Sequence, residues 1–310
     1  MISSFFGKTK PINYIVLSVF LFLFYVVYLF FGADRGLTLD TLPSDSLVLG
    51  TLLLSIYVIS RMVKTEKVTG LSSFAILFFT LLLGVFSDAL GDSNAIFANF
   101  FLLLAIWRLL AIKSVRNVKH KIFDASFLIC AASLFYDWAL IFMILVFVGI
   151  NVYDRKPPKN WMVPFLAMVT VLILSFTTLI VYDSLDFFEN HYRFTIDFLS
   201  NDFLGQDGIV KLLIYLSIML AIMFLVFLKV RKKGGGKLVL LRMVFLAFVL
   251  GAAVSFLRFN EASPVLITFF PAAVFLTNYL ETIKKAKLRE LVVVICILTS
   301  LLLFVLELKL

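Results

Sequence analysis

Long apolar runs, each bounded by charged or turn-forming residues, follow one another along almost the whole chain. Such runs predict segments that cross a bilayer, because a helix needs roughly 20 apolar residues to span the hydrocarbon core. A chain of 310 residues, 62% of them apolar, has room for about eleven spans with short connections. The predicted spans are 11–32, 46–60, 71–87, 95–112, 122–136, 138–153, 161–182, 209–229, 238–257, 265–281 and 290–307. The fifth and sixth are short, and a hairpin that does not fully cross is the alternative for that pair.

The distribution of Lys and Arg predicts how these spans are oriented. If the residues before the first span are cytoplasmic, all but five of the 28 Lys and Arg residues fall on the cytoplasmic side, as the positive-inside rule requires. The exceptions are Arg35, Arg193, Lys211, Arg258 and Lys309. The predicted fold class is therefore all-α: one polytopic membrane domain, residues 1–310, in a bacterial-type inner membrane, with the N-terminus cytoplasmic and the C-terminus outside.

Composition excludes other classes of protein. A mean hydropathy of +1.08 excludes a water-soluble globule that buries a single core. The formal net charge of +9 reflects the cytoplasmic excess of basic residues, so no nucleic-acid partner is predicted. Cys130 and Cys296 lie within apolar runs, where a thiol packs as a small hydrophobe. The run 11–31 is too long for a cleaved signal peptide, and we expect it to remain as the first span.

Two connections stand out by their charge. The largest outer connection, 183–208, is acidic and aromatic, and it is predicted to form one or two amphipathic helices on the outer interface. The cytoplasmic loop 229–242 is basic and contains a triple-glycine hinge. Its charge is interpreted as a topology signal, with the binding of anionic lipid headgroups as the alternative.

Three outer carboxylates are candidates for catalysis. Asp34 follows the first span, and Asp88 and Asp92 follow the third. If residues 88–92 are helical, Asp88 and Asp92 share one face, a spacing that suits a base and its orienting partner or a hard cation. The pattern leaves open whether a divalent cation is needed. The alternative is that all three carboxylates are solvated ends of spans.

Asp124, Asp137 and His191 are further candidates. Asp124 lies about one turn inside a predicted span and Asp137 lies between two short apolar segments, and ionisable groups at membrane depth are candidates for function. The alternatives are a contact from Asp124 back to Lys121 and an interfacial position for Asp137. His191 has no Cys or second His nearby, which favours a structural role over a metal site.

Residues 1–13, MISSFFGKTKPIN, and residues 259–264, FNEASP, resemble an uncharacterised family of bacterial polytopic inner-membrane proteins. The likeness extends over nearly the whole chain. It implies a multi-span fold and carries no established activity.

A looser resemblance is carried by residues 98–104, ANFFLLL, and residues 131–136, AASLFY, on either side of a basic loop. Together they resemble the middle spans of GT-C glycosyltransferases. Those enzymes are multi-span membrane proteins that transfer a sugar from a polyprenyl phosphate on the outer side of the membrane. The first outer loop of this chain is shorter than the helix-bearing loop of that family.

The GT-C resemblance implies roles for particular residues. An acidic residue in the first outer loop and another in the second would fall on Asp34 and Asp88. The lipid phosphate would be held by Arg258, Lys211 or Arg35.

The sequence therefore supports three functional hypotheses. The leading one is a GT-C-like transferase that uses a polyprenyl-phosphate-linked sugar. The second is a non-catalytic subunit or scaffold of an envelope complex, in which 183–208 binds a partner protein. A transporter is the third, because neither paired broken helices nor a charged midplane relay is evident.

Overall fold

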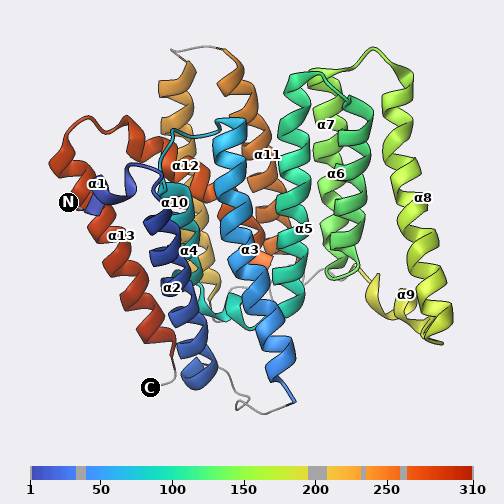
Figure 1. Ribbon diagram of the computed structural model, residues 1–310, viewed down its shortest axis with the longest axis horizontal. Helices are drawn as coiled ribbons and strands as arrows, with labels where there is room; N and C mark the ends of the chain where they lie inside the picture. The colour runs from blue at the N-terminus through green and yellow to red at the C-terminus, as the bar shows by residue number, and fades with distance from the viewer. Residues whose placement is uncertain (1, 33–39, 195–207, 232–234, 259–263, 309–310) are drawn as a thin grey trace.

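The computed structural model describes residues 2–32, 40–194, 208–231, 235–258 and 264–308. Within these ranges all regular structure is helical (Figure 1). The elements are α1 (Ile2–Phe6), α2 (Pro11–Val27), the π-helical η1 (Tyr28–Gly32), α3 (Leu42–Glu66), α4 (Phe74–Val85), η2 (Ser87–Leu90), α5 (Ser93–Leu110), η3 (Ala111–Ser114), α6 (Val118–Ser133), η4 (Asp137–Phe142), α7 (Met143–Tyr153), α8 (Pro158–Val181), α9 (Asp186–His191), α10 (Ile209–Arg231), α11 (Gly236–Leu257), η7 (Pro264–Thr268), α12 (Phe269–Thr282) and α13 (Ala286–Glu307).

Eight helical segments of the described chain are long and apolar enough to cross a membrane. Two shorter apolar helical segments, Phe74–Val85 and Asp137–Tyr153, accompany them. Each predicted span overlaps a helical segment, so the prediction of an all-helical protein with several apolar helices long enough to cross a membrane is confirmed.

Local sequence explains how these helices tolerate polar residues and where they begin. Pro11 and Pro158 occupy first-turn positions, where the missing N–H breaks no hydrogen bond. Within the apolar helices, hydroxyl groups donate hydrogen bonds to backbone oxygens one turn earlier. Ser55 Oγ donates to Thr51 O at 2.9 Å, and Thr80 Oγ1 donates to Ile76 O at 2.9 Å. These bonds satisfy polar groups that lipid cannot solvate.

The helices lie side by side, with α4, α5, α11 and α12 toward the middle and α13 and α8 at opposite edges (Figure 1). Burial agrees with this arrangement: in the most apolar 18-residue stretch of each segment, 78% of the residues are buried in Pro264–Thr282, against 17% in Ala286–Glu307 and 22% in Pro158–Val181. The edge helices therefore present apolar side chains outward, as expected for contact with lipid.

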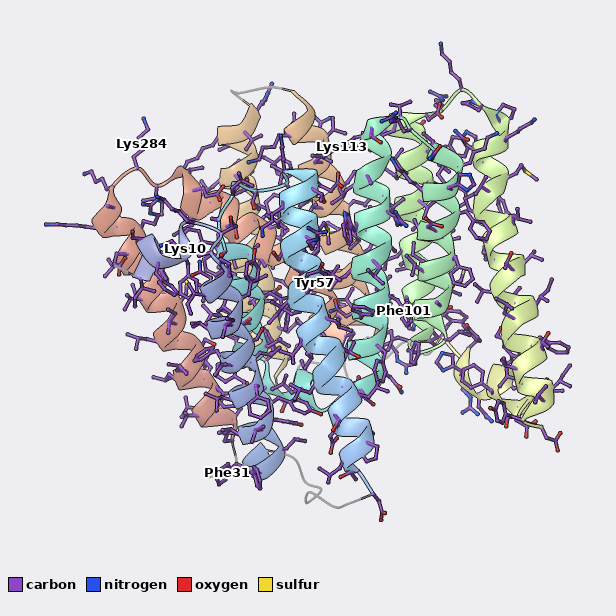
Figure 2. The ribbon with its side chains drawn as sticks, viewed as in Figure 1. Lys10, Phe31, Tyr57, Phe101, Lys113 and Lys284 are labelled. Atoms are coloured by element: carbon purple, nitrogen blue, oxygen red, sulfur yellow. The ribbon has the colours of Figure 1, made fainter. Side chains whose placement is uncertain are left out.

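The two ends of the helices differ in character. Lys113 and Lys284 lie at one end, which we call the basic end, and Phe31 lies at the other, which we call the opposite end (Figure 2). At the basic end, the backbone N–H groups of Ile2 and Ser3 donate to the carboxylate of Glu290 at 2.6 and 2.9 Å, which holds α1 against α13.

Of the two loops singled out by their charge, the basic one is shorter than predicted. Of 183–208, residues 183–194 and 208 are described, and they contain one helix, α9, of six residues. Of 229–242, helix α10 extends to Arg231 and α11 begins at Gly236, so most of the predicted loop is helical.

Candidate functional site

A group of charged residues joins α13, α10 and the turn η2 at the opposite end. Glu307, at the end of α13, accepts hydrogen bonds from Ser87 N at 3.0 Å and from Ser87 Oγ at 2.6 Å. The other carboxylate oxygen of Glu307 forms an ion pair with Lys211, near the start of α10. The ammonium of Lys211 also lies 4.5 Å from the centre of the Phe86 ring, within the range of a cation–π interaction.

Asp88 lies beside this ion pair. It follows Ser87 directly in η2, and its side chain is exposed. We call Asp88, Lys211, Glu307 and Ser87 the carboxylate–lysine cluster. It combines an exposed carboxylate with an ammonium. A carboxylate can accept the proton of a hydroxyl group, and an ammonium can bind a phosphate.

The connection that follows the first predicted span starts next to this cluster. The π-helical turn η1 ends at Gly32 and packs against η2, which carries Asp88. Short π-helical turns are frequent at functional sites. Two of the predicted site residues, Asp34 and Arg35, lie outside the described residues.

Asp92 does not share a helical face with Asp88, so that expectation is wrong. The short helix η2 ends at Leu90, and Asp92 is the N-cap of α5, where its carboxylate accepts a hydrogen bond from Ala95 N at 2.9 Å. An Asp at the N-cap accepts a hydrogen bond from a backbone N–H of the first turn, which favours the start of a new helix at this point. No group of three or more His, Cys, Asp or Glu residues that could hold a metal ion occurs among the described residues.

Asp137 and Arg258 form a second polar group at the opposite end, which connects η4 with the end of α11. The Oδ2 atom of Asp137 lies 3.8 Å from Nη1 of Arg258, and the two side chains are only 4% and 12% exposed. Asp137 also accepts hydrogen bonds from Trp138 N at 2.8 Å and Phe194 N at 3.1 Å. Asp137 is therefore buried within the protein.

The segment after α9 is held by the same part of the fold. His191 Nε2 lies 2.7 Å from Ser133 O, and the Tyr192 hydroxyl lies 3.0 Å from Ser133 Oγ, both at the end of α6. The His191 ring stacks on Phe187, with 4.7 Å between ring centres. Burial raises the pKa of the Tyr192 phenol, and the hydrogen bond with Ser133 opposes that shift.

Asp124 has a different partner from the predicted one. Its Oδ2 lies 3.2 Å from Nε of Arg108, and both side chains are exposed, whereas Lys121 donates to Ala111 O at 2.7 Å and to Ser114 Oγ at 2.6 Å. Lys121 and Asp124 are three residues apart on α6, a spacing at which two side chains can meet. Helix α5 packs closely against α6, however, and its Arg108 is the partner of Asp124 instead. We assign Asp124 no functional role.

Glu307, Ser133 and Tyr192 were not identified by sequence reasoning. Glu307 is an acidic residue at the end of an otherwise apolar run, and Lys211 is a basic residue near the start of another. Opposite charges at the same end of two spans are complementary, and this signal predicts such a pair. The contacts of Ser133 and Tyr192 depend on tertiary packing and leave no comparable signal.

The fold and these sites define a class: a multi-pass helical membrane protein with ion pairs between its helices. The family model described as "Family of unknown function (DUF6427)" matches residues 14–310, so the chain belongs to this family. The prediction of an uncharacterised membrane-protein family is confirmed. Neither the curated proteins nor the solved structures include a match to this chain.

Proposed function

We propose that this protein is a GT-C-like glycosyltransferase that transfers a sugar from a polyprenyl phosphate at the outer leaflet. The observation that carries the proposal is the position of exposed Asp88 next to Ser87, which binds the Glu307 carboxylate of the Lys211 ion pair, where η1 delivers the first outer connection. The pattern implied by the GT-C resemblance requires acidic residues of the first and second outer loops near one another. The packing of η1 on η2 supports that requirement.

In the proposed reaction, a carboxylate accepts the proton of the acceptor hydroxyl as its oxygen attacks the anomeric carbon of the donor. The bond between that carbon and the phosphate oxygen breaks, and the polyprenyl phosphate leaves with the electron pair. Asp88 is the described candidate for the base, and Asp34 is the candidate from the first outer loop. Lys211 would bind the phosphate, and Glu307 would position the Lys211 ammonium.

The proposal includes an orientation. The basic end faces the cytoplasm of a bacterial inner membrane, the chain crosses about eleven times, and the opposite end faces outward. The N-terminus is then cytoplasmic and the C-terminus external. The positions of Lys113 and Lys284 at one end of the helices support this orientation (Figure 2).

The test is a transfer assay with purified protein in liposomes, using a panel of polyprenyl-phosphate sugars labelled in the sugar. We expect D88N, D34N and K211M each to lower the initial rate by at least about 100-fold, as for removal of a catalytic group. E189Q, which removes an exposed carboxylate from the described part of the outer connection, is the matched control and should retain the wild-type rate.

Two results would overturn this proposal. One is a folded wild-type protein that transfers no sugar from any donor of the panel. The other is transfer that persists at the wild-type rate in D34N, D88N and K211M. Thermal unfolding of each variant separates a loss of catalysis from a loss of fold.

A second candidate function, a subunit of an envelope complex, is favoured by the acidic edge of residues 183–189. Asp183, Asp186 and Glu189 are exposed, while Tyr192 and His191 hold the same segment against α6. A fixed acidic edge suits a basic protein partner. Chemical cross-linking in native membranes, followed by purification, tests it: a partner lost in the variant D183N/D186N/E189Q supports this function, and a clean monomer from wild type opposes it.

A further inference from the structure

A cavity of about 440 Å³ opens at the basic end, far from the carboxylate–lysine cluster. It lies where the ends of α3 and α7, the helix η3 and the start of α11 meet. Its volume falls within the range of small-molecule sites, roughly 300–1,000 Å³. The residues that line it are Glu66, Lys67, Lys113, Tyr153, Gly236, Lys237, Val239 and Leu240.

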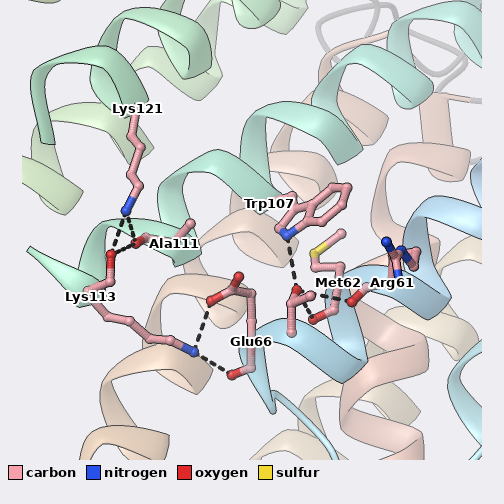
Figure 3. A network of polar contacts seen from close by, with 9 residues as sticks. Arg61, Met62, Glu66, Trp107, Ala111, Lys113 and Lys121 are labelled. Atoms are coloured by element: carbon pink, nitrogen blue, oxygen red, sulfur yellow. Dashed lines mark hydrogen bonds and ion pairs between the residues drawn. The ribbon is translucent and has the colours of Figure 1, made fainter. Parts of the chain in front are cut away.

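Part of the charge around this cavity is already neutralised. Glu66 is buried, and its Oε2 lies 2.9 Å from Nζ of Lys113 (Figure 3). Lys113 also donates to the backbone oxygen of Glu66 at 2.6 Å. Lys67 and Lys237 contribute two further positive charges, so the lining carries a net charge of two positive units.

Neutral donors add to these charges. The hydroxyl oxygen of Tyr153 is buried and has no hydrogen-bond partner within the described residues. Gly236, the first residue of α11, lines the cavity, and no side chain caps that helix end. Backbone N–H groups at a helix start attract anions.

Lys67 adopts a left-handed conformation, with φ of 52°, and ends α3. Val239 and Leu240 supply apolar surface on the α11 side of the cavity. The lining therefore combines cationic groups, a phenol and apolar side chains, which suits an anionic group attached to a hydrophobic or carbon-rich body.

We infer that this cavity is a binding site for a phosphate-bearing ligand, held by Lys67, Lys237 and the Tyr153 hydroxyl. The contacts between Lys113 and Glu66 hold η3 against the end of α3. The ligand is either the headgroup of an anionic lipid or a soluble phosphate ester. Phosphate suits the site because it accepts several charge-assisted hydrogen bonds at once.

The experiment measures binding to the full chain in nanodiscs of a zwitterionic lipid. One arm adds phosphatidylglycerol and counts bound lipids by native mass spectrometry, and the other arm adds glycerol 3-phosphate and measures heat by calorimetry. We expect K67Q/K237Q to weaken the binding of the probe by about thirtyfold, since each lysine near an anionic group contributes about fivefold. That variant leaves the pair between Glu66 and Lys113 intact.

The matched control is K284Q/K285Q, which removes two exposed lysines from the basic end without altering the cavity lining. Y153F removes only the hydroxyl, and we expect it to weaken binding with unchanged thermal unfolding. Weakening of phosphatidylglycerol binding alone identifies a lipid, and weakening of glycerol 3-phosphate binding identifies a soluble ester. The inference is overturned if K67Q/K237Q binds both probes as wild type does, or no more weakly than K284Q/K285Q.

Discussion

The carboxylate of Asp137 lies 3.8 Å from the guanidinium of Arg258 and links the start of η4 to the end of α11. Asp137 simultaneously accepts the N–H of Phe194, so one carboxylate connects two membrane helices with the segment that follows α9. Three parts of the fold thus depend on a single buried charge.

Replacement of Arg258 by Met should destabilise the protein by about 3 kcal/mol, because Asp137 would remain buried without its counter-charge. The double variant D137N/R258M, which removes both charges, should regain much of this loss. Thermal unfolding in detergent measures the difference. Equal unfolding temperatures for R258M and wild type would show that the ion pair contributes nothing to stability.

Gly84 allows α4 to approach two other helices closely. A Cβ atom there would lie 2.6 Å from Ser300 Oγ in α13 and 2.7 Å from the Phe24 ring in α2. We therefore expect G84V to lower the stability by about 1–3 kcal/mol through overpacking. Gly50, where a Cβ atom would meet nothing within 4 Å, is the matched control, and G50V should unfold near the wild-type temperature. A similar effect of both variants would contradict this packing argument.

The Tyr192 phenol should weaken the fold at high pH. Its pKa in the folded protein is raised above the usual value by burial, so the folded state keeps the proton longer than the unfolded state. This contribution to stability is present below about pH 10 and is lost as the pH rises through the pKa of the folded state. Unfolding temperatures of wild type and Y192F, measured from pH 8 to about 11.5, should converge as the pH rises. Parallel curves would exclude this role.

The orientation of the helices can be tested by cysteine labelling. In a chain whose two native cysteines are replaced by Ala, a single Cys at position 284 should react from the cytoplasmic side and one at position 182 from the outer side. Tyr182 and Lys284 are exposed and lie on opposite sides of the predicted membrane. Labelling of both positions from one side would show that the predicted span parity is wrong.

The positions of the helices were largely predictable. Lipid offers no hydrogen bonds to backbone N–H and C=O groups, and a helix satisfies those groups within a single apolar run. Pro11–Gly32 and Ile209–Arg231 begin where the sequence predicted, since charge or proline marks those boundaries. The span Leu42–Glu66 is longer than its predicted range, 46–60. Its last turn contains polar residues that bury against neighbouring helices, as Glu66 does, and hydropathy alone cannot anticipate such burial.

The candidate sites were predictable only in part. Asp88, Lys211 and Arg258 were identified because charges at the ends of apolar runs are conspicuous. Their partners were not identified, since an ion pair between distant spans depends on which helices become neighbours. Asp92 illustrates the same limit at short range: a spacing of four residues indicates a shared helical face, but a helix boundary between Asp88 and Asp92 separates them.

The ion pair between Lys211 and Glu307 has a consequence for the order of assembly. The ribosome delivers the η2 turn first, then α10 with Lys211, and α13 with Glu307 after both. Until α13 enters the membrane, the Lys211 ammonium lacks its Glu307 partner. Insertion of α13 therefore completes the carboxylate–lysine cluster, and chains interrupted before that helix would reach the bilayer with this end still unassembled.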